Sequence, residues 1–589
     1  MVASELNSNE SVHRGGDFAA NNRLVLLSAF AVVIGGLSTL SAMVLLAAIR
    51  FFTNLFYFHT LSTAATSPAD NHLGWLAIFV PALGGLIVGL MARFGSDKIR
   101  GHGIPEAIEA ILYGKSRMSP KVAILKPLSS GIVIGSGGPF GAEGPIIMTG
   151  GAAASLLAQA FHLTAAERKA LLVAGACAGM TAVFGTPLAA VLLAVELLLF
   201  ELRPRSLLPV GLACAIAGFL RPLWAGSGPL FPLETPEPGW IAMLSCVVAG
   251  LVSGAVSASM TRMLYFVEDF FSHLRLHWMW WPAIGGLIVG VGGYFQPRAL
   301  GVGYDVIGDL LQNHLVLSVA LSLLVVKMLI WAIALGSGTS GGVLAPLLMI
   351  GAGLGSVLGG WLPGGSPQLW ALVCMAAILG GTMRAPLTAV VFAFGLTHDV
   401  NAFLPTILGC VVAYGFTVIV MPRSILTEKI ARRGRHVFRE YGVDPLERHF
   451  VDEVMTREVT TIDATESLAS VLVSHFGADQ KFRAYPVVLD GKLVGMIDRS
   501  VINRLKGEDP GRPLSELLSG HSSDAYIVPS DTCRAASWRL ASDALERLPV
   551  VDSPSSRRVV GIVSRSDLVK PSRVSHEEEV QRDRALFQQ

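Results

Sequence analysis

The sequence predicts an all-α polytopic membrane bundle with two internal repeats, which we expect to be inverted, followed by a small α+β soluble pair of domains. Only 15% of the 589 residues are charged and 52% are hydrophobic, whereas one soluble domain would carry about 25% charged residues. The charges are unevenly spread, at about 9% of residues 23–421 and about 30% of residues 422–589. Two short motifs rich in glycine or proline also recur about 200 residues later.

Charge balance and cysteine spacing exclude several classes of protein. A net charge of +2 gives no indication of nucleic-acid binding. The six cysteines stand singly, without metal or redox spacing, so neither a disulfide framework nor a zinc site is expected. No nucleophile–base or metal-ligand constellation emerges, so we expect the protein not to be an enzyme.

The apolar runs predict a bundle of long and interrupted helices. Residues 1–22 are polar and lack the pattern of a cleavable signal peptide. The first run, Leu24–Ala48, is long enough to span a bilayer. Shorter runs follow at Leu73–Ala92, Leu207–Phe219, Trp240–Met260, Trp281–Tyr294, Leu315–Leu335, Leu369–Gly381 and Phe403–Met421. Glycine- and proline-rich stretches separate them, and irregular backbone survives in a membrane only inside protein or around a cavity. The pattern therefore favours a transporter-like or channel-like bundle.

An internal echo predicts repeats at about 24–225 and 240–421. Gly135-Ser136-Gly137 leads to Pro145, and Gly336-Ser337-Gly338 leads to Pro346 with the same spacing. Pro187-Leu188 is echoed by Pro386-Leu387. Recurrence of small residues in membrane helices is the alternative explanation. Two echoes at nearly one offset favour true repeats, whose interface often holds a substrate site.

Three glycine-rich breaks, each followed by a proline and an apolar helix, are the candidate ligand sites. They are Gly101–Pro105, Gly141–Pro145 and Gly341–Pro346. Helix N-termini carry free N–H groups and about half a positive charge, so convergent starts form an anion site without a fixed cation. A lysine there would bind an anion too tightly to release it quickly. The alternative is that these helix starts serve packing alone.

Glu143 is the sharpest candidate residue. An ionisable side chain inside an apolar, glycine-rich membrane segment indicates function by default. A carboxylate beside an anion-binding helix terminus would compete with the anion for the same N–H groups, and protonation would release it. Glu143 is therefore predicted to act as a gate, a proton carrier or both.

These motifs, in this order and spacing, resemble the CLC family of chloride channels and proton-coupled chloride exchangers over about residues 24–435. The resemblance implies chloride transport by a homodimer with one pore per subunit. It also implies that Glu143 is the gating glutamate and that Lys126 lies near the pore. The anion-binding residues it implies are Gly101, His102, Gly103, Ile104, Pro105, Gly141, Ala142, Gly144, Pro145, Gly342, Val343, Leu344 and Leu426.

Departures from the family pattern bear on selectivity and on proton coupling. The family usually has Ser or Pro where His102 stands, and aromatic residues where Leu344 and Leu426 stand. His102 either helps to choose the anion or only caps its helix. Exchangers of the family often carry a second glutamate, whose position falls on Leu197, beside Glu196. Glu196 either serves the proton pathway or is structural. We therefore slightly favour a passive or weakly coupled conductor over an exchanger.

The charged tail resembles a pair of CBS domains, at about 450–507 and 513–570. Short strands at 484–488 and 548–552 are each followed by a second strand, giving a tandem repeat of about 60 residues. Ser564 and Asp567 match the family's ribose-contacting pattern, whereas the first unit has Asp498 and Val501 there. The pair either binds an adenine nucleotide or is a dimerising regulatory module without a ligand, which is slightly favoured. The tail 571–589 completes the chain.

A basic cluster from Arg423 to Arg439 follows the last apolar run. The positive-inside rule places such a cluster on the cytoplasmic face, so we expect a multi-pass protein of the plasma (inner) membrane with both termini cytoplasmic. The rival hypothesis is a membrane-anchored CBS nucleotide sensor that transports nothing. It would leave Glu143 without a purpose in its apolar segment.

Overall fold

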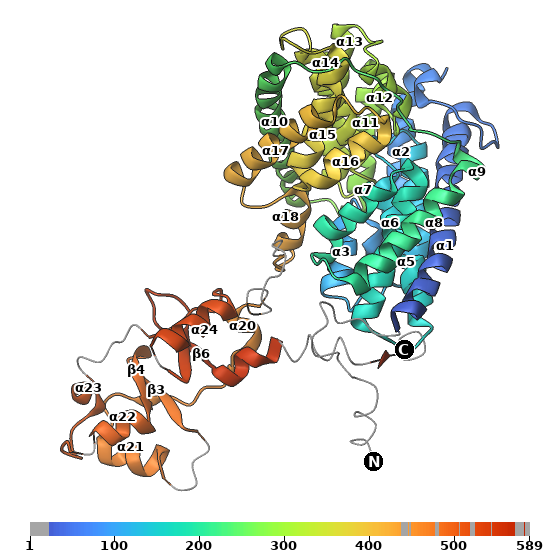
Figure 1. Ribbon diagram of the computed structural model, residues 1–589. Helices are drawn as coiled ribbons and strands as arrows, with labels where there is room; N and C mark the ends of the chain where they lie inside the picture. Colours follow the sequence, from blue (N-terminus) through green and yellow to red (C-terminus); the bar gives the residue numbers. More distant parts are fainter. Residues whose placement is uncertain are drawn as a thin grey trace. The chain divides into compact units, whose positions relative to one another are not determined.

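The computed structural model divides the chain into two compact units, shown in Figure 1. The first comprises residues 1–435 with 581–589, and the second residues 436–580. The structure describes residues 23–437, 446, 449–477, 482–505, 507–518, 525–543, 545–571 and 582–583. The predicted polar segment 1–22, most of the tail 571–589 and Arg439 lie outside the described residues.

The first unit is a bundle of α-helices. Its first half contains α1 Arg23–Thr53, α2 Phe79–Phe94, α3 Ile104–Leu112, α4 Pro120–Gly135, α5 Glu143–Gln159, α6 Ala165–Phe184, α7 Pro187–Leu193, α8 Pro204–Leu220 and α9 Pro222–Ala225. Its second half contains α10 Trp240–His273, α11 Trp281–Phe295, α12 Tyr304–Leu311, α13 Leu317–Gly336, α14 Leu344–Leu358, α15 Pro367–Met383, α16 Pro386–Thr397 and α17 Phe403–Val420. Helix α18, Ile425–Arg432, follows them.

Helix length and composition agree with a membrane bundle. Within the described residues, six helical stretches are long and apolar enough to cross a membrane, and four apolar helices of 10–17 residues are shorter. Two helices end in a π-helical turn, at Asn54–Phe58 after α1 and at Ala194–Leu199 after α7.

A two-residue strand, β1 Leu163–Thr164, pairs antiparallel with β7 Arg582–Asp583. Proline stands at one of the first two positions of α3, α4, α7, α15 and α16, where its missing N–H costs no helical hydrogen bond.

The order of helices repeats, and the contact between α2 and α11 shows that the repeats are inverted. A Cβ at Gly85 would lie 2.1 Å from the carbonyl oxygen of Pro282, and one at Gly89 would lie 2.1 Å from that of Met279. The equivalent Gly286 meets Pro81 in the same way. Residue numbers rise along one helix as they fall along the other, so the two equivalent helices run antiparallel. An antiparallel pair with exchanged contacts is related by a two-fold axis across the helices, as in inverted-topology repeats.

Two buried lysines make the same contacts in the two repeats. Lys126 Nζ donates to the carbonyl oxygens of Ile99 and Gly101, both at 2.8 Å. Lys327 Nζ donates to those of Ala299 and Gly301, at 2.9 and 2.8 Å. Both side chains are fully buried. Each lysine thus supplies the hydrogen bonds that the irregular backbone before α3 or α12 needs inside the bundle.

The second unit contains two small sheets with their helices. Strands β2 Ile462–Asp463, β3 Ala484–Leu489 and β4 Lys492–Asp498 form one sheet in that order, with β2 and β3 parallel and β4 antiparallel to β3. Strands β5 Arg547–Val551 and β6 Val559–Ser564 form an antiparallel pair. The helices are α20 Val451–Val454, α21 Leu468–His475, α22 Arg499–Leu505, α23 Leu514–Leu517 and α24 Cys533–Ser542.

The two predicted ranges of the tail, 450–507 and 513–570, pack their leading segments into each other's cores. Leu514 and Leu517 of α23 belong to the core of β2–β4, and Val451 and Val454 of α20 belong to the core of β5 and β6. Backbone hydrogen bonds fix the exchange, because Ser515 N donates to Ala464 O at 2.8 Å. Each domain therefore buries the apolar leading segment of the other.

Candidate functional site

The three glycine-rich breaks meet at one place inside the first unit. Gly101 N donates to the carbonyl oxygen of Thr339 at 3.0 Å. Gly141 and Gly342 exchange two backbone hydrogen bonds, of 3.4 and 3.0 Å. Segments that lie about 200 residues apart in the chain are thus joined at the interface of the inverted repeats, where such folds place a substrate site.

Glycine at these positions permits the close approach. Gly103 has φ +90°, and a Cβ there would lie 2.6 Å from the carbonyl oxygen of Gly144. A Cβ at Gly144 would lie 1.8 Å from the carbonyl oxygen of His102. Any side chain at either position would push the three breaks apart.

Three helices begin at these breaks. Helix α3 begins at Ile104, α5 at Glu143 and α14 at Leu344. The N-caps of α5 and α14 are Ala142 and Val343, which offer no side-chain oxygen to the first N–H groups. Unmet N–H groups at two buried helix starts provide donors for an anion.

The carboxylate of Glu143 bridges the two repeats. Its Oε1 accepts a hydrogen bond of 3.0 Å from the backbone N–H of Ala345, at the start of α14. Its Oε2 is buried and has no hydrogen-bond partner among the residues that the structure describes. A Cβ at Gly141 would lie 1.8 Å from Oε2, so glycine leaves the space that the carboxylate fills. The titratable side chains of Lys327 and Tyr304 interact electrostatically with it. The carboxylate of one repeat thus sits where the helix start of the other would hold an anion.

His102 lies at the same junction, just before α3. It is 1% exposed, and neither ring nitrogen has a hydrogen-bond partner within the described chain. Unpaired buried polar groups are unfavourable, so a ligand or water would stabilise this ring. Of the two interpretations of His102, this favours contact with a ligand, because the ring accepts no hydrogen bond at the start of α3. Glu106 instead accepts one from the N–H of Gly103, the N-cap residue.

The other predicted residues of the bundle have differing surroundings, and all but the half-buried Glu196 are buried. Leu344 stands at the first position of α14 and Leu426 at the second position of α18, and both are apolar and buried. Glu196 lies away from the breaks, in the π-helical turn after α7, and caps α16. Its oxygens accept hydrogen bonds from Leu387 N at 3.2 Å, Thr388 N at 2.7 Å and Thr388 Oγ1 at 2.6 Å. These contacts support its structural interpretation, and its place on a proton pathway stays a prediction.

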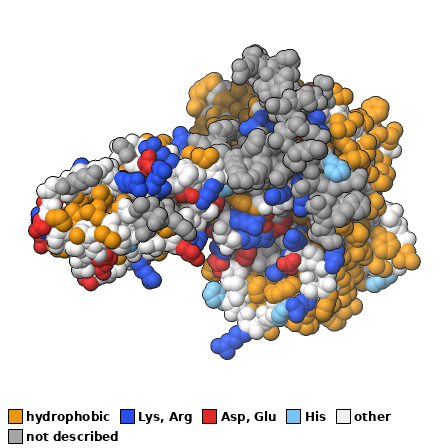
Figure 2. All heavy atoms as spheres, turned by 90° about the horizontal axis from the view of Figure 1, so that it is seen from below, with side chains coloured by type: hydrophobic (Ala, Val, Ile, Leu, Met, Phe, Trp, Pro, Cys, Tyr) orange, Lys and Arg blue, Asp and Glu red, His pale blue; other side chains and the backbone are white. Residues whose placement is uncertain are grey.

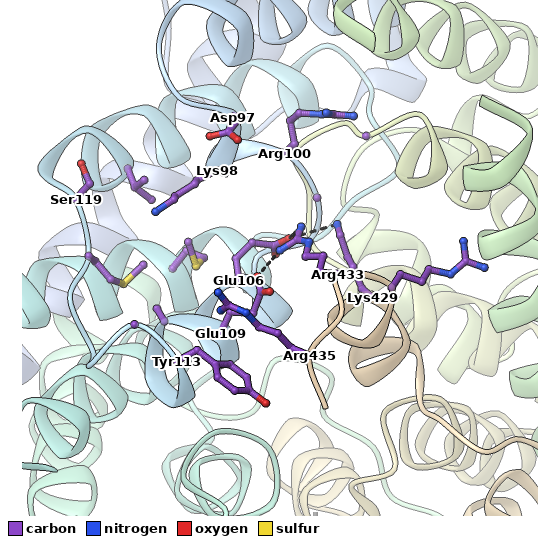
Figure 3. A pocket seen from close by; sticks show the side chains of 18 of the residues that line it. Asp97, Lys98, Arg100, Glu106, Glu109, Tyr113, Ser119, Lys429, Arg433 and Arg435 are labelled. Atoms are coloured by element: carbon purple, nitrogen blue, oxygen red, sulfur yellow. Dashed lines mark hydrogen bonds and ion pairs between the residues drawn. The ribbon is translucent and has the colours of Figure 1, made fainter. Parts of the chain in front are cut away.

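A charged cavity of about 750 Å³ opens at the α3 and α18 end of the bundle (Figure 3). Glu106 of α3 accepts hydrogen bonds from Gly103 N at 2.9 Å and from Arg433 at 3.0 Å, and it pairs with Lys429 at 3.3 Å. Figure 2, which views this end, shows basic and acidic side chains gathered near the middle of the bundle and hydrophobic ones towards its edge. Glu106 thus fixes the helix start beside His102 to α18.

Comparison with known proteins identifies the family. Residues 84–418 match the model of the voltage gated chloride channel family. The chain belongs to this family. Residues 451–505 and 521–572 match the CBS domain. A voltage-gated ClC-type chloride channel ClcB from Citrobacter koseri is 30% identical over 377 residues, which cover 62% of this chain and 88% of that protein.

Solved structures share the fold. A slow cyanobacterial Cl⁻/H⁺ antiporter matches 70% of this chain and 98% of its own, with a TM-score of 0.61 and 20% identity. A eukaryotic CLC transporter matches 92% of this chain and 98% of its own, with a TM-score of 0.61 and 19% identity. The predicted all-α membrane bundle with a CBS pair is confirmed.

Within the CLC bundle, sequence reasoning missed three groups that the structure brings to the site. Lys327 recurs 201 positions after Lys126, so the repeat offset already contained the signal for it. Glu106 stands three residues after Gly103, the spacing of a capping box. Nothing in the sequence pointed to Tyr304. The Gly-Val-Gly segment before it shares only its two glycines with the first break, so it was not recognised as an equivalent break.

The CBS pair contains the predicted ribose-contacting residues at the end of β6. Ser564 Oγ donates to Asp567 Oδ2 at 2.6 Å, and Ser564 N donates to the same oxygen at 2.9 Å. Burial opposes ionisation of Asp567, but hydrogen bonds from Lys570 and Ser564 outweigh it and lower its pKa. At the equivalent place after β4, Asp498 accepts from the N–H groups of Ser500 and Val501. The two places therefore present different side chains to a ligand.

Proposed function

We propose that this protein transports small anions, chiefly chloride, through a CLC-type pore in each subunit of a homodimer, with Glu143 as the gate. The observation that carries the proposal is the hydrogen bond of 3.0 Å between Glu143 Oε1 and Ala345 N. Through this hydrogen bond the Glu143 carboxylate occupies a backbone N–H that an anion would otherwise use. The chloride channel relatives support the choice of anion.

Gating follows from competition for backbone N–H groups. When Glu143 is ionised it holds Ala345 N, and when it is protonated or displaced that N–H is free for a passing anion. Both buried lysines near the breaks donate to backbone carbonyls. The anion therefore meets backbone dipoles and His102 rather than an ammonium group, which favours quick release.

Two modes of transport remain open under this proposal. Leu197 in place of the second glutamate, and a Glu196 that caps α16, favour a passive or weakly coupled conductor. The alternative is a proton-coupled exchanger, which is the mode of the cyanobacterial Cl⁻/H⁺ antiporter that shares this fold. The comparisons thus lend no support to the preference for a conductor.

Flux into liposomes tests both the function and its mode. Purified protein should carry chloride, and a reversal potential that follows the chloride gradient alone would identify a conductor. A reversal potential that also shifts with the pH gradient would identify an exchanger. Absence of flux with any of several anions would overturn the proposal in favour of a membrane-anchored nucleotide sensor.

We further propose regulation by the CBS pair, with Ser564 and Asp567 as the contacts for an adenine nucleotide. The basic residues Lys429, Arg432 and Arg433 of the α18 end support a cytoplasmic location for this end of the bundle and for the CBS pair, in the plasma (inner) membrane. The protein is proposed to have no enzymatic activity of its own.

A further inference from the structure

A second cavity, of about 640 Å³, lies on the face of the bundle opposite to the α3 and α18 cavity. Its lining includes Arg298, Leu300 and Gly301, which an offset of 200 residues equates with Lys98, Arg100 and Gly101 of the first cavity. Because the repeats are inverted, equivalent segments face opposite sides of the membrane. In Figure 1, α3 and α18 lie toward one end of the bundle and α12 toward the other.

Three buried hydrogen-bond donors of this cavity have no partner. They are Arg221 Nε, Trp224 Nε1 and Tyr304 Oη, and none contacts an acceptor within the described part of the chain. An unpaired buried donor is unfavourable, so three donors that line one cavity indicate a group that accepts hydrogen bonds from them. Apart from the hydroxyl oxygen of Tyr304, which can also accept, no unpaired buried side-chain acceptor among the described residues lines the same cavity.

The surrounding structure holds two of these donors, those of Arg221 and Tyr304, in place. The guanidinium of Arg221, which is 6% exposed, lies over Gly185, where a Cβ would come within 2.9 Å of Cζ. Its other end donates to the carbonyl oxygens of Gly226 and Gly228, at 3.2 and 3.4 Å. The ring of Tyr304 packs against Phe184, with 6.0 Å between ring centroids. Phe184 and Gly185 are adjacent at the end of α6, so one helix end positions both donors.

The charges and the lining of the cavity suit an anion. Its charged side chains are Arg50, Arg221 and Arg298 against Asp70 and Asp305. Arg298 pairs with Asp309 at 3.8 Å, so Arg221 is the cation that is both buried and directed at the cavity. The apolar side chains of Ile134, Val183 and Leu300 complete the inner part, and low polarity strengthens any attraction between an anion and Arg221.

We propose that Arg221, Trp224 and Tyr304 form an outer binding site for a small inorganic anion, one step outside the Glu143 gate. The site contains a guanidinium N–H, an indole N–H and a phenol O–H, which can all donate hydrogen bonds to an anion. None of the three is a carboxylate, which would compete with the anion for donors. Tyr304 also interacts electrostatically with Glu143, which couples the site to the gate. As a staging site for a transported anion, it rests on the proposed function.

Bromide provides a direct probe of the site. Crystals of the full chain grown in bromide should give an anomalous difference peak among the three donors. Tyr304→Phe removes only the hydroxyl and should weaken the peak, and Arg221→Gln should abolish it. Absence of the peak in the wild-type protein, with water alone in the cavity, would overturn the proposal. The anomalous peak does not depend on transport, so it tests the binding site independently of the proposed function.

Flux provides the functional counterpart. In liposomes of known orientation, Arg221→Gln should raise the external chloride concentration for half-maximal flux about tenfold, the loss of one charge-assisted hydrogen bond. Tyr304→Phe, which leaves the backbone contacts of Arg221 in place, should raise it about threefold. The internal half-maximal concentration should not change in either variant.

Arg50→Gln is the matched control, because it removes the same charge from an exposed side chain of the same cavity. We expect less than about a twofold change, as for a screened surface charge. Equal effects of Arg50→Gln and Arg221→Gln would mean that only the net charge of the vestibule matters, and that would also overturn the proposed site.

Discussion

The two repeats share a scaffold and differ in the side chains placed on it. Lys126 and Lys327 make the same pair of carbonyl contacts, 201 residues apart. At equivalent positions, however, the first repeat has His102 and Glu143 where the second has Val302 and Leu344. The symmetric scaffold brings the helix starts together, and the asymmetric side chains are the ones that we propose as the gate and as an anion contact. The proposed functional residues therefore stand at the positions where the two repeats have different side chains.

The largest expected effect comes from breaking the shared scaffold. Lys126→Met and Lys327→Met each remove two hydrogen bonds to buried carbonyl oxygens, and a buried group left unpaired costs about 1–3 kcal/mol. We expect both variants to lower the thermal unfolding temperature of the detergent-solubilised protein, and by similar amounts. Lys121→Met, on the exposed side of α4, is the control and should leave it unchanged. A strong effect of one lysine with none of the other would contradict a common scaffold.

The second-largest expected effect is on the pH dependence of chloride flux, and it distinguishes Glu143 from Glu196. In Glu143→Gln the pH dependence of chloride flux should vanish, whereas a single titrating gate changes its ionised-to-protonated ratio about tenfold per pH unit. Glu196→Gln should keep that dependence, because its oxygens cap α16 rather than the helix starts at the breaks. The measurement is liposome flux between pH 5 and 8. Loss of the pH response in Glu196→Gln would place Glu196 on the proton pathway after all.

A similar comparison applies within the CBS pair. Asp567→Asn should weaken binding of an adenine nucleotide about tenfold by calorimetry on the full chain, whereas Asp498→Asn should not. The lowered pKa of Asp567 means that its carboxylate stays charged at neutral pH and gains a proton only in strong acid. The Asp567 contribution should therefore be level from pH 7 down to about pH 5 and be lost below the usual pKa of about 4. Equal effects of the two variants would refute the assignment of one intact site.

The smallest expected effect concerns selectivity. His102→Ser should change the ratio of chloride to nitrate flux about threefold, the equivalent of a weak hydrogen bond to the anion. Val302→Ser, at the equivalent position of the second repeat, should leave the ratio unchanged. An unchanged ratio in His102→Ser would assign the ring a packing role.

Sequence reasoning reached most of the fold and the principal residue of the site. The apolar runs, the echoes near Pro145 and Pro346 and the charged tail predicted the bundle, its repeats and the CBS pair. Glu143 was found because a carboxylate in an apolar segment is conspicuous without any structure. The partners of Glu143 were out of reach, since Ala345 lies 202 residues away along the chain.

What the sequence alone determined is local: where helices begin, where the backbone must break, and which segments are too apolar for water. Proline, glycine and hydropathy act on neighbouring residues, so their effects can be read in order along the chain. The tertiary structure decided which groups meet. Glu143 accepts a hydrogen bond from the start of α14, and Glu196 caps the start of α16. Residues 451–455 and 514–518 each pack into the core of the other CBS domain. Arg221, Trp224 and Tyr304 line one cavity. The physical reason is that these contacts arise from the packing of inverted repeats and paired domains, in which residues far apart in sequence share one place in space.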